Sequence, residues 1–287
     1  MAANPTGEGN DRLFCWEQVL KTNRVFRISQ IFAPRDFVDR LLPLYAFFSS
    51  IEQICSGISD EDVAHRKLNW WQIECLHKGV SNSHHPVLKE LGRTDALDCL
   101  HRDNIAQLLN GAETRLLANA PPDMEALKKM CIEFQRPQLE LEIGVSGLEA
   151  AALEFEPDML ARNGLLQLIR ESSHPNGQGS FWWIPLNTLA RHGVSREDIG
   201  GNPQSPVVTR LMKEIITAGE QWGRGALFSD QDRAVDFSPA RHVFAINGLY
   251  LRKLKRLRGA TPDRFALELG RMGPGDLFAA WRSARRL

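Results

Sequence analysis

Apolar residues recur every three or four positions along most of the chain, which is the period of an amphipathic helix. The clearest stripe runs from Asp36 to Ile54. Only Phe181–Ile184 resembles a strand, and it has no obvious partner. The pattern therefore predicts an all-α fold of roughly ten helices. The remaining helices are predicted over residues 59–76, 86–91, 95–118, 123–147, 157–171, 186–191, 205–228, 238–257 and 273–284, with a short helix opening at Ser195.

Helix starts and chain breaks mark where the predicted helices begin and end, and they indicate a single domain. Ser59-Asp60-Glu61-Asp62 combines an N-cap with an acidic first turn, as helix starts prefer. Residues 174–179, rich in Gly and Pro, form the clearest break. No repeat or linker interrupts the chain. We therefore predict a polar N-terminal segment with a lead-in helix over residues 1–28 and a single domain over residues 29–287.

The overall charge is balanced, with 35 Lys and Arg against 35 Asp and Glu. This balance argues against a globally basic nucleic-acid binder, and no nucleic-acid partner is expected. The five cysteines are odd in number and lack metal-type spacing, which favours a reducing compartment. No segment resembles a secretory signal or reaches the ~18 apolar residues of a transmembrane helix. We therefore expect a cytoplasmic protein and leave open a peripheral position on the inner membrane.

The charge is unevenly distributed along the chain. From Arg241 onward, the sequence contains eleven Lys and Arg but only three acidic residues, Asp263, Glu268 and Asp276. The net charge of this part is therefore +8. One interpretation is a solvated helix face. The other is that basic C-terminal helices contact an anionic membrane surface or an acidic partner. Under the second interpretation, binding depends on four cations of one helix: Arg252, Lys253, Lys255 and Arg256.

No P-loop, HExxH or GxSxG motif occurs, but two segments resemble the squalene/phytoene synthase family of head-to-head prenyl transferases. The first contains Arg40–Phe47, which reads RLLPLYAF, followed by Trp70-Trp71 and by His85-Pro86-Val87. The second is Phe181–Asp198, which contains LARHGVSRED. The resemblance spans about residues 30–285. It implies an isoprenoid synthase-type helical bundle around a central cavity.

The family's two aspartate-rich motifs, which hold Mg²⁺ against a diphosphate, are broken here. In the first motif Glu52 is the only carboxylate left, and Ser49 stands at the arginine position. In the second, Gln167, Arg170 and Glu171 stand where the family has Asn, Arg and the first Asp. No catalytic residue is therefore assigned beyond the degenerate positions Glu52 and Glu171. These are also weak metal candidates, and no metal or other cofactor is expected.

A pocket retained from the family fold would have a polar end near these motifs. Glu52 and Arg170 also have a purely structural interpretation, a buried ion pair between facing helices. The residues expected to bind an isoprenoid diphosphate or lipid are Tyr45, Ser49, Gln53, Gln167, Arg170 and His174.

Two hypotheses about function follow from the resemblance. In the first, the protein has lost Mg²⁺-dependent prenyl transfer and is a binding or assembly factor with a protein partner at a membrane. The broken motifs resemble those of the complex I assembly factor branch. In the second, it is an active prenyl transferase that condenses two allylic diphosphates and uses Mg²⁺ at a degenerate site. An enzyme should keep Glu52 and Glu171 across an open, wettable cavity, whereas an assembly factor should close that region with side chains such as Phe48 and Trp182.

Overall fold

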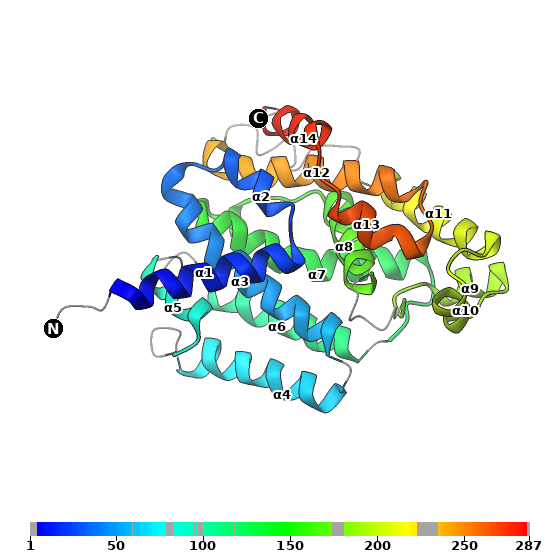
Figure 1. The fold of residues 1–287 in the computed structure, drawn as a ribbon, viewed down its shortest axis with the longest axis horizontal. Helices are drawn as coiled ribbons and strands as arrows, with labels where there is room; N and C mark the ends of the chain where they lie inside the picture. Colours follow the sequence, from blue (N-terminus) through cyan, green and yellow to red (C-terminus); the bar gives the residue numbers. More distant parts are fainter. Residues whose placement is uncertain are drawn as a thin grey trace.

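The computed structural model describes residues 5–58, 60–78, 83–94, 96, 100–117, 119–173, 181–222 and 235–285. These residues form a bundle of α-helices joined by short turns, without an extended strand (Figure 1). None of the described helices is long and apolar enough to cross a membrane. The helices are α1 Pro5–Thr22, α2 Phe26–Ser29, α3 Arg35–Gly57, α4 Glu61–Gln72, α5 Pro86–Arg93, α6 Arg102–Leu116, α7 Met124–Val145, α8 Pro157–Ser172, α9 Leu186–His192, α10 Arg196–Gly201, α11 Pro206–Gln221, α12 Arg241–Leu257, α13 Phe265–Gly270 and α14 Pro274–Ala284.

Several predicted helix starts are confirmed at the level of hydrogen bonds. The carboxylate of Asp60 accepts from the backbone N–H of Val63, so α4 begins at its acidic first turn. Asp123 caps α7 in the same way. Ser195 and Asp198 form a reciprocal capping box at the start of α10, which satisfies backbone donors that the helix itself leaves free.

The strand-like interpretation of Phe181–Ile184 is wrong, because this segment is a turn. The backbone N–H of Ile184 donates to the carbonyl of Phe181, and that of Leu186 donates to the carbonyl of Pro121. The run is apolar because Trp183 and Ile184 are buried in the core. A short apolar run has the same composition in a buried turn as in a buried strand.

Two predicted helices are shorter in the structure. The helix expected over 95–118 begins only at Arg102; of its first part, residues 95 and 97–99 lie outside the described residues. The helix expected over 205–228 ends at Gln221, and residues 223–228 lie outside the described part. The lead-in helix expected within residues 1–28 is α1, which packs against α3 and α5 through the buried side chains of Cys15 and Val19.

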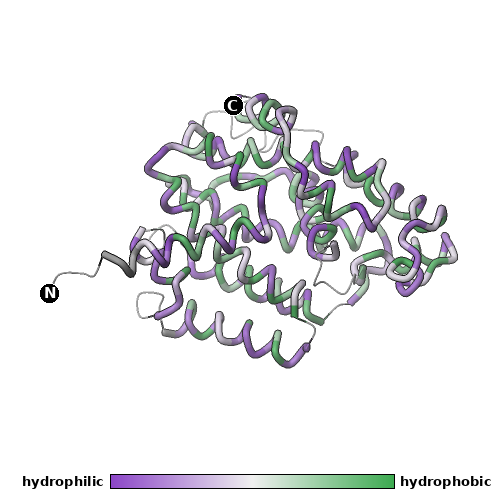
Figure 2. Tube along the Cα trace, viewed as in Figure 1, coloured by the Kyte–Doolittle hydropathy of each residue, from purple (hydrophilic) through white to green (hydrophobic). Residues whose placement is uncertain are grey.

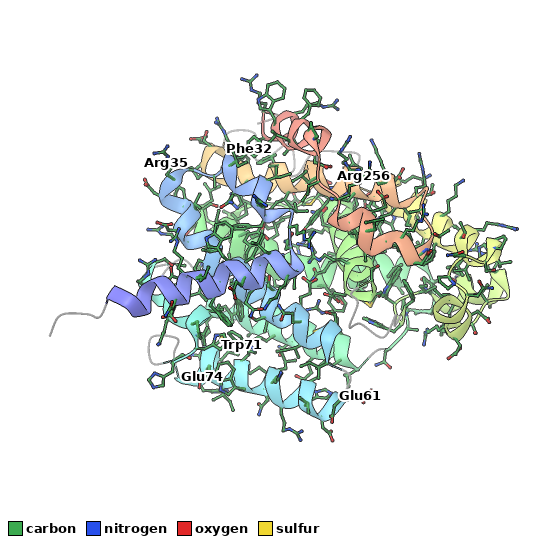
Figure 3. All side chains as sticks on the ribbon, viewed as in Figure 1. Phe32, Arg35, Glu61, Trp71, Glu74 and Arg256 are labelled. Carbon is green, nitrogen blue, oxygen red and sulfur yellow. The ribbon has the colours of Figure 1, made fainter. Side chains whose placement is uncertain are left out.

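Helix α3 lies at the centre of the bundle and contacts six other helices: α1, α4, α5, α6, α7 and α8. Nearly every residue from Leu41 to Ser49 is buried. Along the outer helices, hydrophobic and hydrophilic residues alternate (Figure 2). On α4, for example, Trp71 is buried and Glu61 is exposed (Figure 3). Glu52, the carboxylate of the first motif segment, thus lies on a central helix that other helices surround.

Helices α7 and α8 approach each other closely at a glycine. A Cβ atom on Gly164 would lie 2.4 Å from the carbonyl oxygen of Cys131 on α7, so no larger residue fits there without moving a backbone. This contact fixes α8, whose last turns carry Arg170 and Glu171, against α7. Both broken motifs are therefore held on rigid, packed elements.

Candidate functional site

Glu52 of α3 and Arg170 of α8 face each other in the interior and form a two-pronged ion pair. Arg170 Nε donates to Glu52 Oε1 over 2.8 Å, and Arg170 Nη2 donates to Glu52 Oε2 over 2.5 Å. Only 6% of Glu52 is exposed. Burial alone would lower the pKa of Arg170, but Glu52 beside it raises that pKa far above its ordinary value. The two residues therefore form the buried ion pair that the structural interpretation of the sequence predicts.

The second surviving carboxylate, Glu171, is paired with Arg115 of α6 at 2.5 Å. Gln167 also donates to it, from Nε2 to Oε1 over 3.1 Å. Burial raises the pKa of Glu171, and Arg115 opposes that rise. Sequence reasoning missed Arg115. The signal was present, since Arg115 continues the buried stripe of Leu108 and Ala112 at helical spacing.

The two ion pairs change what these positions can do chemically. Mg²⁺ prefers an octahedron of oxygen ligands and usually keeps several waters. Here the carboxylate oxygens of Glu52 and Glu171 accept hydrogen bonds from guanidinium groups. A cation placed between them would meet the positive charges of Arg115 and Arg170 in a medium that screens poorly. The residues present therefore do not fit the multi-ion clamp that the family resemblance implies.

A further buried carboxylate, Glu142 of α7, lies beside this cluster. Burial raises its pKa to about 7, and a hydrogen bond from Gln138 opposes the rise. Tyr45 of α3 is 1% exposed; burial and then Glu142 raise its pKa. The sequence analysis did not single out Glu142.

The other predicted site residues do not converge on the carboxylates. Ser49 accepts a hydrogen bond from Thr22 Oγ1 at 2.6 Å. Gln53 donates to Gln18 Oε1 at 2.7 Å. Both therefore face α1 and not Glu171. His174 lies outside the described residues.

A cavity of about 280 Å³ lies on the other side of Arg170, between the end of α1 and helices α8, α12 and α13. Asn23 is 5% exposed, and its Oδ1 has no hydrogen-bond partner. Lys21 and Arg24 are exposed beside it and make no ion pair with any described residue. The cavity is lined by Lys21, Thr22, Asn23, Arg24, Val25, Leu166, Arg170, Ser173, Tyr250, Lys253, Ala266, Leu269 and Gly270.

A larger and more open groove of about 940 Å³ lies between α1, α3, α4 and the start of α5. Its aromatic wall is built around His85, whose ring centroid is 4.8 Å from that of Trp71 and 5.4 Å from that of Trp70. Gln53 lines this groove together with Lys21 and Arg24. Lys21 and Arg24, at the end of α1, thus border both the cavity and the groove.

No group of three or more His, Cys, Asp or Glu side chains able to hold a metal ion occurs among the described residues. Cys15, Cys55, Cys75 and Cys131 are free thiols. Burial raises the pKa of Cys55 to about 12, which keeps the thiol protonated and unreactive near neutral pH. The Cys55 thiol therefore adds no charge to the interior beside the Glu52–Arg170 and Glu171–Arg115 pairs.

The all-α arrangement is that of the isoprenoid synthase fold, as two solved structures show. A dehydrosqualene synthase in complex with ligand superposes with a TM-score of 0.60, at 13% identity over 88% of this chain and 87% of that one. The squalene synthase HpnC from Alicyclobacillus acidocaldarius superposes with a TM-score of 0.53, at 15% identity over 93% of this chain and 94% of that one. At such identities the likeness concerns the fold alone.

The sequence itself identifies the family. The squalene/phytoene synthase family model matches residues 21–273. The chain therefore belongs to the squalene/phytoene synthase family. No curated protein matches it in sequence.

Proposed function

We propose that this family member has lost Mg²⁺-dependent prenyl transfer and acts as a binding or assembly factor. The observation that carries the proposal is that Glu52 and Glu171, the carboxylates left from the two motifs, are each bonded to an arginine. Both are buried, 6% and 7% exposed. This is the closed arrangement expected of a protein without the metal clamp. Phe48, 8% exposed and packed against Tyr45 and Phe47, adds to the closure.

The size of the inner cavity supports the same conclusion. Small-molecule sites typically measure about 300–1,000 Å³, and the cavity beside Arg170 measures about 280 Å³. A head-to-head condensation must hold two prenyl diphosphates at once. A space just below that range suits one partly enclosed ligand better than two.

The ligand proposed for this cavity is an isoprenoid diphosphate or another anionic lipid. Lys21 and Arg24 supply positive charge that no described carboxylate neutralises. The Asn23 amide oxygen is a buried acceptor without a partner, and such groups cost free energy unless a ligand or water bonds them. A head group with a hydroxyl or a protonated phosphate would donate to it. Leu166, Val25 and Leu269 offer apolar contact for the chain of the lipid.

A role in assembly of respiratory complex I is the finer part of the proposal and rests on sequence resemblance. Ala46-Phe47 followed by Glu52, and the segment beginning at Arg170, resemble the motifs of that branch. Such a role requires a protein partner at a membrane. It predicts that the protein is recovered with inner-membrane proteins when it is isolated from cells after mild crosslinking.

The alternative is an active prenyl transferase with a degenerate metal site. One observation favours it: Glu52 lies close enough to Glu171 for its charge to raise the pKa of Glu171. The two carboxylates could then share an ion if Arg115 and Arg170 swung away. In that case catalysis would require both ion pairs to open.

Calorimetry with farnesyl diphosphate, with and without Mg²⁺, followed by product analysis, tests the proposal. We expect binding that does not depend on Mg²⁺ and no hydrocarbon product. The double variant Lys21→Glu/Arg24→Glu should weaken binding at least tenfold. Lys213→Glu, which changes an exposed lysine of α11, should leave it unchanged. Mg²⁺-dependent binding with a prenyl product would overturn the proposal and establish the alternative.

A further inference from the structure

Helix α14 has its small residues inside and its large apolar residues outside. Asp276, Ala280 and Ala284 form its buried face, exposed by 0%, 0% and 4%. Its exposed apolar residues are Leu277 at 47%, Phe278 at 59% and Trp281 at 41%. A surface helix normally directs such side chains to the core. An exposed cluster of this kind marks an interaction site.

The outward orientation is fixed by contacts on the buried face. A Cβ atom on Gly248 of α12 would lie 2.7 Å from the Cβ of Ser283 and 2.9 Å from the carbonyl oxygen of Ala279. The two helices therefore touch backbone to backbone. Turning α14 by half a turn would drive Phe278 or Trp281 into this contact, where there is no room.

An ion-pair cluster holds the same face. The Asp276 carboxylate is completely buried and bonds Arg252 Nε at 3.0 Å and Arg256 Nη2 at 2.7 Å. Rotation of α14 would separate this carboxylate from both partners and leave charges unpaired in the interior. The packing of α14 against α12 therefore keeps the apolar face of α14 exposed.

These contacts also show where the four cations named for the basic tail lie. Arg252 and Arg256 are engaged with Asp276. Lys253 is 1% exposed and donates to the backbone carbonyls of Leu269 and Arg271. Lys255 alone among the four predicted cations is fully on the surface without a described partner. Most of the cations on α12 support the fold and are not available to a membrane.

The cations available beside the apolar cluster are on α14 and just after it. Arg282 is exposed, and the guanidinium of Arg285 lies over the Trp281 ring, 4.5 Å from its centroid. The rings of Phe278 and Trp281 are 5.7 Å apart. The only carboxylate of α14, Asp276, faces inward. The outer surface therefore combines aromatic and apolar side chains with positive charge.

A neighbouring segment extends this surface. Helix α2 contacts α14 and leads into the turn Gln30–Phe32, where Ile31 is 66% exposed. Arg27 on α2 is also exposed. Helices α2 and α14 lie at the same end of the molecule in Figure 1. In Figure 3 side chains project from α14 away from the bundle.

We propose that this surface of α14, defined by Leu277, Phe278, Trp281, Arg282 and Arg285, docks the protein on an anionic lipid bilayer. Aromatic and aliphatic side chains flanked by arginines suit the boundary between head groups and acyl chains. Anionic lipids attract the exposed cations of this surface, Arg282 and Arg285. This proposal rests on the proposed function, because it names the membrane surface on which the assembly factor would act. It is tested without prenyl diphosphate, so its failure is separate from failure of the ligand proposal.

Vesicle sedimentation tests this docking. The full chain is mixed at low salt with vesicles of phosphatidylcholine alone or with phosphatidylglycerol added. We expect at least tenfold more binding to the anionic vesicles, falling as salt is raised. Phe278→Ser/Trp281→Ser and Arg282→Glu/Arg285→Glu should each reduce it about tenfold or more. All four residues are exposed, so both variants should keep the wild-type melting temperature.

Matched controls distinguish binding by this surface from nonspecific apolar or electrostatic binding to the vesicles. Leu267→Ser removes an apolar residue of α13 that is more exposed, at 67%, than Phe278 or Trp281, and Lys213→Glu reverses a charge on α11. Both should bind anionic vesicles like the parent protein. Unchanged binding in the two α14 variants would overturn the proposal. So would light scattering that shows a dimer which either α14 variant dissociates, because the surface would then be covered by a second copy.

Discussion

Arg170 and Glu52 join the two broken motifs directly. Both carboxylate oxygens of Glu52 accept hydrogen bonds from one guanidinium, at 2.8 and 2.5 Å, between residues 118 positions apart in the chain. Such paired geometry is among the stronger kinds of protein hydrogen bonding. The pair is therefore a neutral, self-contained contact between α3 and α8.

The first prediction concerns the cost of breaking this pair. Arg170→Met should lower the free energy of unfolding by about 3–5 kcal/mol, because Glu52 would remain as an unpaired buried charge. Urea unfolding followed by circular dichroism measures it. The double variant Glu52→Leu/Arg170→Met should recover most of the loss, since it removes both charges. If the double variant were as unstable as the single one, packing by Arg170 and not its charge would explain the effect.

The second prediction concerns pH and Glu142. Burial raises its pKa from 4.5 to about 7, so the folded protein takes up a proton between these values that the unfolded chain does not. Its ionisation therefore destabilises the protein above pH 7, and the cost disappears as pH falls toward 4.5. Glu142→Gln should stabilise the protein by roughly 3 kcal/mol at pH 8 and by little at pH 4.5. Urea titrations across this range test it, and a gain independent of pH would contradict it.

The third prediction concerns His242, a completely buried side chain of α12. Burial lowers its pKa from 6.5 to about 3. Between these values the unfolded chain binds a proton that the folded protein excludes. This residue therefore destabilises the protein as pH falls below 6.5. His242→Leu should flatten the loss of stability between pH 6 and 4, as read from melting temperatures. A parallel decline in both proteins would show that other groups govern acid unfolding.

The fourth prediction concerns the close contact of α7 and α8. Gly164→Ala should destabilise the protein by about 1–3 kcal/mol or more, because the new methyl group meets the carbonyl of Cys131. Gly200→Ala is the matched control, since nothing lies within 4 Å of its added Cβ. Thermal unfolding of the two variants compares them directly. An equal melting temperature for Gly164→Ala and the parent would mean that the helices separate easily.

The helical architecture was predictable because its signals are local. Apolar spacing, the cap at Asp60 and the capping box at Ser195 each act within one or two turns, and the structure confirms them. The segment Phe181–Ile184 was misinterpreted because apolar composition alone does not distinguish a buried turn from a strand. The cavity beside Arg170 was beyond such reasoning, since it is lined by the end of α1 and by three further helices, α8, α12 and α13.

By itself, the sequence determined the all-α fold and the family. Only the tertiary structure decided what the remaining charges do. Arg115 meets Glu171 across 56 positions of sequence, and Arg252 and Arg256 turn inward to Asp276 while the aromatic side of α14 turns outward. Periodicity shows which residues share a helix face. Which element packs against that face depends on the tertiary arrangement of the helices. In the low dielectric of the interior, that arrangement decides whether a charged side chain binds a ligand or another part of the protein.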